Sequence, residues 1–326
     1  MDAATLTLAC AYGLDLAVGD PRWIPHPVRG LGRMIQWLEK ILRAAFQDES
    51  FAGWILVIGI GSGTFVVART ISWSGGYLSS LLNYPSWLRF ILDVLLLYVC
   101  LSTRDLAVES WAVYETLRFG DLPAARSKVG MIVGRDTDRM DEREVVRATL
   151  ETIGESTLDG IIAPLFYAVL GGVPWACLYK AINTLDSMVG YRSARYIKFG
   201  RPAAQIDTWM NMIPARITAW LFVLVAPLVG FSASGSFRAT YRDAWYRGQN
   251  SWIPEAALAG ALGVQLGGTN FYSGKLVQTP NLGYPTEKLE LDRIPQAIRL
   301  MYACSFLGIV AALFFRWVID RIWWVK

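Results

Sequence analysis

Long apolar runs alternate with charged stretches along the chain, a pattern typical of a protein that crosses a membrane several times. A helix needs roughly 20 mostly apolar residues to span a bilayer. Not every run reaches that length, so we expect about five membrane segments. The runs that fit, fully or in part, are 3–18, 51–71, 87–102, 161–178, 215–231 and 300–319.

One of these runs, 161–178, is interrupted by Gly171, Gly172 and Pro174. Irregular backbone at membrane depth is tolerated only where it packs on protein or lines a cavity. We therefore expect this run to be re-entrant or buried in protein rather than a simple lipid-facing helix.

The distribution of Lys and Arg predicts an orientation in the membrane. Segment 20–50 holds five basic residues and segment 72–86 holds none. Because basic loops stay in the cytoplasm, the first segment is expected inside and the second outside. The later loops 180–212 and 233–299 are both basic, and simple alternation of spans cannot place both inside.

Strand-like alternation of polar and apolar residues is scarce, so the predicted fold class is all-α. We expect a polytopic helical membrane protein with a helical portion at the cytoplasmic face. Residues 1–103 would form N-terminal membrane helices with a cytoplasmic loop at 20–50. Residues 104–299 would form the catalytic helical region, with one or two further membrane or re-entrant segments. Residues 300–326 would form a C-terminal membrane helix.

Composition supports the membrane class and excludes others. The chain of 326 residues is 54% hydrophobic and 18% charged, against about 45–50% and 25% in soluble domains. A net charge of +4 is too small to indicate a nucleic-acid partner. One histidine and four cysteines without C-x-x-C spacing argue against a zinc site or a disulfide framework. The N-terminus lacks a basic region, so no cleaved signal peptide is expected.

The first polar segment follows the N-terminal apolar run. Three prolines within seven residues prevent a regular helix there. A stiff loop at a membrane edge would then carry four polar residues, Asp20, Arg22, His26 and Arg29. The alternative is a juxtamembrane turn whose arginines only set topology, although His and Asp are not needed for that.

A charged stripe follows one face of a helix predicted within 133–160. Its last three members are all carboxylates, and like charges four residues apart repel by a few tenths of a kcal/mol. A bound cation such as Mg²⁺ would relieve that repulsion. A solvated charged helix is the alternative. The stripe consists of Arg143, Arg147, Glu151, Glu155 and Asp159.

A second polar face lies directly after the interrupted apolar run. Lys180, Asn183 and Asp186 recur at three-residue steps and so share one helix face. A lysine near a membrane often just extends its ammonium to the interface, but that does not explain the Asn and Asp beside it. With Arg192 and Arg195 shortly after, the group offers what a phosphate and metal site needs.

Two further segments carry weaker signals. Arg104 lies with two carboxylates on one predicted helix face, which a solvated face explains almost as well. The glycine-rich segment 262–283 contains Gly274-Lys275, a pair that also occurs in phosphate-binding P-loops. However, five residues rather than four separate Gly268 from Gly274, and neither Ser nor Thr follows Lys275. It is therefore not a P-loop, although a glycine-rich anion-binding turn remains open.

Seven segments of the chain, taken in order, form a specific pattern. They are "GDPRWIPHPVRGLGR", "STRDLAVES", "VGRDTDRMDE", "ETIGESTLDGIIAPLFYAVLGGVP", "YKAINTLDSMVGYRSARYIKFG", "NMIPARITA" and "PEAALAGALGVQLGG". Together they resemble the adenosylcobinamide-phosphate synthase family (CobD/CbiB) over nearly the whole chain. The chain departs from the usual family pattern at Ser156, Leu158 and Trp252.

The resemblance implies a multi-pass protein of the bacterial inner membrane with its active site on the cytoplasmic side. Its expected reaction joins 1-amino-2-propanol, or its O-phosphate, to the propionate of adenosylcobyric acid. ATP would be the cosubstrate and Mg²⁺ the cofactor. The expected partners are these substrates, the lipid bilayer and other membrane enzymes of cobalamin synthesis.

Acyl-phosphate chemistry needs cations on phosphates, carboxylates on a metal and a base for the amine, and we assign candidate residues on that physical basis. For catalysis they are Lys180, Asp186, Glu151 and Glu155. For substrate and phosphate binding they are Arg22, His26, Arg104, Arg135, Asn183, Arg192, Arg195, Arg216, Asn270 and Lys275. For the metal they are Asp159, Asp136 and Asp20.

Two other functional classes stay open at this stage. One is a non-catalytic membrane sensor or assembly protein that shares the fold. The other is a transporter, because Asp93 lies within a predicted span and carboxylates inside membranes are functional candidates.

Overall fold

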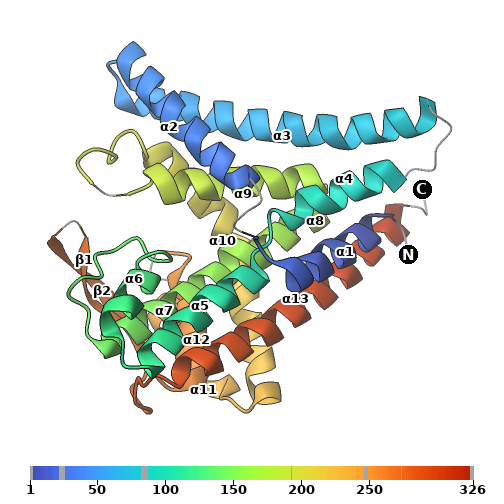
Figure 1. The fold of residues 1–326 in the computed structure, drawn as a ribbon. Helices are drawn as coiled ribbons and strands as arrows, with labels where there is room; N and C mark the ends of the chain where they lie inside the picture. The colour runs from blue at the N-terminus through green and yellow to red at the C-terminus, as the bar shows by residue number, and fades with distance from the viewer. Residues whose placement is uncertain are drawn as a thin grey trace. The chain divides into compact units, whose positions relative to one another are not determined.

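The computed structural model describes residues 3–21, 26–81, 87–191, 193–245, 249–272 and 274–323. These residues are mainly α-helical, with one antiparallel pair of strands (Figure 1). The helices long and apolar enough to cross a membrane are Glu49–Leu78, Glu142–Gly171, Arg201–Val229 and Arg293–Ile322, and a shorter apolar helix covers Ala3–Val18. The predicted class of a helical polytopic membrane protein is confirmed.

The chain divides into two compact units, each made of segments that are distant in sequence. The first comprises Met1–Ser102, Ala163–Asn211 and Ile309–Lys326, and the second comprises Thr103–Ile162 and Met212–Gly308. The boundaries of these units differ from those of the three-part division predicted from the sequence. That division describes function, and it stays a prediction.

The first unit is built around α3 (Glu49–Leu81), which packs on α2 (Pro27–Ala45), α4 (Trp87–Tyr98) and α9 (Val173–Val189). Its core is apolar, with Ile35, Leu56, Ile60, Leu185 and Phe199 all buried. It also holds α1 (Ala3–Val18), α8 (Ala163–Gly171), the start of α10 (Arg201–Val225) and the end of α13 (Arg293–Trp323).

The interrupted run 161–178 is divided between two helices. Helix α8 ends at Gly171 and α9 begins at Val173. Between them Gly172 has φ of 76°, a conformation that favours glycine. In the helical stretch Glu142–Gly171, 72% of the most apolar window is buried, against 39–44% in the other three long helices. The expectation that protein covers this run is therefore confirmed for its first part.

The second unit contains a mainly helical set of elements and the strands. They are α5 (Thr103–Arg118), α6 (Leu122–Val129), α7 (Glu142–Thr157), the π-helical turn η1 (Leu158–Ile162), the 3₁₀ turn η2 (Ala226–Val229), α11 (Ala233–Ala239), the π-helical turn η3 (Thr240–Ala244), α12 (Trp252–Leu262), β1 (Gln265–Tyr272) and β2 (Lys275–Gly283). The remaining parts of α10 and α13 belong here as well.

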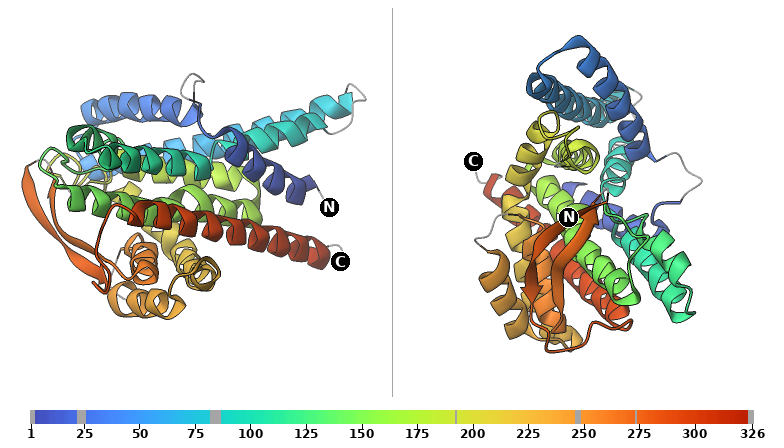
Figure 2. Two further views of the ribbon diagram at one scale, coloured as in Figure 1. Left: turned by 60° about the horizontal axis from the view of Figure 1, so that its bottom comes forward. Right: turned by 90° about the vertical axis from the view of Figure 1, so that its left-hand side faces the viewer.

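The glycine-rich segment forms a β-hairpin, which the all-α expectation misses. Strands β1 and β2 pair antiparallel and lie against α7 and α12 (Figure 2). The register shifts between Leu266 and Gly268, so that Gly267 faces the extra residue of a bulge in β2. A Cβ on Gly267 would overlap the carbonyl oxygen of Pro280. Gly267 therefore allows the two strands to approach closely. Pro280 has no N–H to donate, and it is tolerated because the ladder of hydrogen bonds is interrupted at the bulge.

Candidate active site

Helix α7 carries the charged stripe toward the hairpin. The helix starts with a capping box, in which Asp141 accepts from the backbone N–H of Glu144 and Glu144 accepts from that of Asp141. Its apolar residues Val146, Leu150 and Ile153 are buried. Packing of that side fixes the rotation of the helix and turns the stripe toward β1.

Glu151 is held by two protein groups. One carboxylate oxygen, Oε2, forms an ion pair with Arg135, whose side chain is 6% exposed. The other oxygen, Oε1, accepts from the backbone N–H of Gly267 at 2.8 Å. Arg135 donates a further hydrogen bond to the side-chain oxygen of Asn270. The loop before α7, the helix and β1 are thus joined through charge-assisted hydrogen bonds.

Arg147, one turn earlier on α7, also binds the hairpin. It donates to the carbonyl oxygen of Gly267, to that of Thr269 at 2.8 Å, and to the side-chain oxygen of Asn270 at 3.0 Å. The Asn270 oxygen therefore receives two guanidinium donors, and the side chain of this residue is buried. These contacts position β1 over the stripe.

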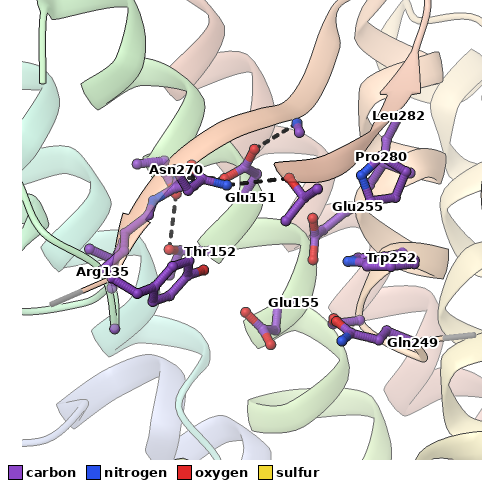
Figure 3. A pocket seen from close by; sticks show the side chains of 17 residues that line it. Arg135, Glu151, Thr152, Glu155, Gln249, Trp252, Glu255, Asn270, Pro280 and Leu282 are labelled. Carbon is purple, nitrogen blue, oxygen red and sulfur yellow. Dashed lines mark hydrogen bonds and ion pairs between the residues drawn. The ribbon is translucent and has the colours of Figure 1, made fainter. Parts of the chain in front are cut away.

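A pocket of about 170 Å³ opens between α7, the start of α12 and the hairpin. Figure 3 shows Glu155 from α7 and Glu255 from α12 directed toward the same space. Its lining combines carboxylates, one guanidinium, amides and aromatic rings. It includes Arg135, Glu151, Thr152, Glu155, Gln249, Trp252, Glu255, Asn270 and Tyr272.

Glu255 is the most altered acid in this pocket. It is 8% exposed. Burial, reinforced by the negative charges of Glu155 and Glu151, raises the pKa of the Glu255 carboxyl well above its usual value; Arg135 and a hydrogen bond from Ser251 oppose this only in part. A buried carboxyl with a raised pKa holds its proton more tightly than an exposed one, and general acid–base chemistry requires a group that can give or take a proton.

The structure brings together four of the residues predicted for the site. Arg135, Glu151, Glu155 and Asn270 all line the pocket. Asn270 lies more than a hundred residues after the other three in sequence, and helix periodicity accounts only for the pair on α7.

The other predicted residues of the second unit lie outside the lining of this pocket. Asp136 accepts from the backbone N–H of Gly274 at 2.6 Å and lines a separate cavity of about 240 Å³ on the hairpin. Arg216 lies 5.4 Å from the ring of Trp245. The rest are exposed or half-buried: Arg104 on α5, Asp159 in η1 and Lys275 at the start of β2.

Lys180, Asn183 and Asp186 all lie on α9, in the first unit. Asn183 donates to Asp207 at 3.4 Å, and Asp207 also accepts from Asn211 at 3.0 Å. The joint site that would combine Lys180 with the α7 carboxylates stays a prediction.

The remaining described candidates of the first unit, Asp20, His26 and Arg195, have partners within that unit. Arg195 pairs with Glu39 at 3.0 Å. His26 caps α2 through Nδ1, and its Nε2 lies 3.3 Å from Asp20. Arg22 and Arg192 lie outside the described residues.

Asp93 has polar partners within the first unit. It accepts from the hydroxyl of Ser72 and lies 3.6 Å from Arg89, four residues earlier on the same helix. These contacts account for the charge without a transport pathway.

The magnesium assignment stays a prediction. Within the described ranges, no group of three or more His, Cys, Asp or Glu side chains has an arrangement that would hold a metal ion. Mg²⁺ commonly takes only one or two carboxylates and completes its shell with water and phosphate oxygens. Glu155 and Glu255, which face the pocket together, fit that requirement.

Sequence reasoning missed Glu255, Gln249 and Trp252 as pocket residues. Glu255 left a signal, because it is the only charged residue in the apolar helix "WIPEAALAGAL". A lone carboxylate in such a helix needs a reason, since burying it ionised is costly. Gln249 left none that distinguishes it from other loop residues, whereas Trp252 stood out only as a departure from the usual family pattern.

Comparison with known proteins gives a consistent result over the whole chain. A family model described as CobD/Cbib protein matches residues 8–301. A cobalamin biosynthesis protein CobD from Geobacter metallireducens is 44% identical over 316 residues, which cover 96% of this chain and 96% of that protein. The proteins of the same name from Clostridium perfringens and Listeria monocytogenes are 38% identical over 322 residues and 42% over 305 residues, covering 97% and 92% of this chain and 99% and 94% of theirs. No solved structure matches the chain.

Proposed function

The chain belongs to the CobD/CbiB family of cobalamin biosynthesis, and from this we propose that it is an ATP-dependent amide synthase. It would join 1-amino-2-propanol, or its O-phosphate, to the propionate carboxyl of adenosylcobyric acid. The product would be adenosylcobinamide or its phosphate.

The observation that carries this proposal is the acid–base pocket of the second unit. Amide formation from an acyl phosphate needs a group that accepts a proton from the attacking amine. Glu155 and Glu255 face one space, and burial raises the pKa of the Glu255 carboxyl. The Arg135–Glu151 pair and Asn270 keep the walls of that space in place.

ATP and Mg²⁺ belong to the proposal as cosubstrate and cofactor. Bound Mg²⁺ would neutralise phosphate charge while the propionate is activated. The carboxylates of the pocket are hard oxygen ligands of the kind that this ion prefers.

We further propose that the protein acts in the bacterial inner membrane with the pocket on the cytoplasmic side. The four long apolar helices support membrane insertion. The basic segment 20–50 supports the sidedness, because loops rich in Lys and Arg stay inside.

A direct assay tests the reaction. Purified protein in detergent is given adenosylcobyric acid, 1-amino-2-propanol O-phosphate, ATP and Mg²⁺, and the corrinoid is followed by mass spectrometry. We expect the amide to form only when all components are present, with free aminopropanol run in parallel to identify the preferred amino alcohol.

Matched variants separate a catalytic pocket from a passive one. Glu155→Gln keeps the size of the side chain and should lower the rate by about 10²-fold or more. Glu142→Gln changes an exposed carboxylate of the same helix and should leave the rate unchanged. A folded native protein that yields no amide would exclude the function and favour a sensor or assembly role.

A further inference from the structure

Helix α2 carries two apolar strips, of which the protein covers only one. Ile35 and Leu42 are buried in the core of the first unit, where α2 packs on α3 and α9. Met34, Trp37 and Ile41 are exposed instead, and Trp37 is 61% exposed. Because these three recur at steps of three and four residues, they share one face of the helix. Beside its buried strip, α2 therefore presents a second, exposed strip to the surroundings.

A cationic edge runs beside the exposed strip. Arg33 and Lys40 are both exposed, and because they are seven residues apart they lie on one line along the helix. Each directly precedes a residue of the strip in sequence, which places it about 100° away around the helix. Arg43 differs, because it pairs with Glu39 at 3.0 Å and with Glu49 at 2.6 Å. Its charge is matched inside the protein, whereas the cationic edge faces outward.

Exposed apolar residues continue from α2 onto a membrane span. Helix α2 ends at Ala45, and α3 begins at Glu49 within a stretch long and apolar enough to cross a membrane. Phe46, in the turn between them, packs edge-on against Phe51 at 5.4 Å between ring centroids, and both residues are exposed. Ile58, farther along α3, is exposed as well. The strip on α2 thus leads along the chain to a helix whose outer surface suits lipid.

Helix α2 itself is too polar to be a further span. It holds four basic residues among 19, and Figure 1 shows it running obliquely to α3 rather than alongside it. A helix with an apolar face, a basic polar face and low overall hydrophobicity typically lies in the membrane interface. Tryptophan on the apolar face fits that place, because its ring favours the level of the headgroups.

We propose that α2 is an interfacial anchor, whose exposed strip inserts among lipids at the membrane surface while Arg33 and Lys40 bind anionic headgroups. Anionic lipids attract Lys and Arg that lie close to the surface. A second copy of the chain is a poorer occupant of the strip, because two cationic edges would approach and repel each other. The proposal rests on α2 and α3 alone and does not depend on the reaction proposed above.

Fluorescence quenching of the full chain in lipid nanodiscs tests the depth of α2. The exposed Cys10 is changed to Ser, whereas the other three cysteines are buried and stay. A fluorophore is attached at Trp37→Cys on the exposed strip or at Gln36→Cys on the polar side. We expect a nitroxide near the lipid headgroup to quench position 37 at least about threefold more than one at the chain end, because an interfacial helix inserts only about 5–10 Å. Iodide in the water should quench position 36 about threefold more than position 37.

A second measurement tests the cationic edge. The discs contain equal amounts of phosphatidylglycerol and phosphatidylcholine, and only one of the two carries the headgroup-level nitroxide. With the fluorophore at Trp37→Cys, the nitroxide on the anionic lipid should quench at least about twofold more, because basic side chains gather anionic lipid around them. Arg33→Gln combined with Lys40→Gln should remove this difference. Arg143→Gln combined with Lys288→Gln removes the same charge from exposed sites of the second unit and should leave it unchanged.

Four results would overturn the assignment. Equal iodide access at positions 36 and 37 would place the exposed strip in water. Stronger quenching from the chain end than from the headgroup would place α2 in the hydrocarbon. Shielding of position 37 only in discs that hold two protein copies would assign the strip to a second copy of the chain. Equal quenching by the two lipids would show that the cationic edge does not bind anionic headgroups.

Discussion

The carboxylate of Glu151 accepts a hydrogen bond from the backbone N–H of Gly267, with 2.8 Å between oxygen and nitrogen. Its second oxygen is paired with Arg135. Both oxygens thus bind protein groups, and Glu151 positions the hairpin against α7. Its predicted catalytic role stays a prediction, and Glu155, one turn later, points into the pocket.

Glu151→Gln should destabilise the protein strongly. The amide cannot neutralise Arg135, whose side chain is 6% exposed. Breaking a buried ion pair by changing one partner typically costs about 3–5 kcal/mol, because the other charge is left uncompensated. Denaturant unfolding in detergent measures the effect, with Glu142→Gln as the control on the same helix. Similar unfolding midpoints for the two variants would show that the pair does not hold the hairpin.

Gly267→Ala should disrupt the hairpin more than Gly274→Ala. The two glycines have similar φ, 78° and 75°. An alanine at either position is strained by about 1 kcal/mol or more. Only at Gly267 would the new methyl group also meet the carbonyl oxygen of Pro280, since nothing lies within 4 Å of it at Gly274. Thermal unfolding of both variants checks this, and equal losses would contradict the bulge geometry.

Local sequence signals were sufficient for much of the fold. The length and hydropathy of 51–71 and 300–319 predicted helices, since a membrane span needs its hydrogen bonds within one segment. The break near Gly172 was also visible. The hairpin was not, because β1 reads "QLGGTNFY", without regular alternation, and its bulge depends on contacts from α7.

The candidate site was predictable only in part. Helical spacing placed Glu151 and Glu155 on one face, which the structure confirms. It did not show that Arg135 and Asn270 would meet them, because such contacts depend on tertiary packing. Glu255 was missed although it is the only charged residue of its apolar helix, because its raised pKa comes from burial beside Glu155 and Glu151, which tertiary packing decides.

Acidity should change the stability of the protein through Glu255. Its pKa is raised in the folded state above that of the unfolded chain, so its favourable contribution is full below the unfolded pKa, about 4.3. As pH rises toward the folded pKa, the unfolded state releases the proton first and stability falls, by up to about 1.4 kcal/mol per pH unit. Glu255→Gln should lack this decline. Melting temperatures of both proteins between mildly acidic and neutral pH give the comparison, and parallel curves would argue against a raised pKa.

Lys180 offers the sharpest test of the predicted role of α9. Its side chain is half-buried, and no hydrogen-bond or ion-pair partner is found for its ammonium in the described part of the chain. Removing the charge should therefore cost little stability, within about 1 kcal/mol. If Lys180 stabilises phosphate charge during the reaction, Lys180→Met should lower the rate of amide formation by about 10²-fold or more. The exposed Lys198→Met serves as the matched control. A folded Lys180→Met protein with native activity would remove Lys180 from the catalytic set, and leave the reaction to the pocket of the second unit.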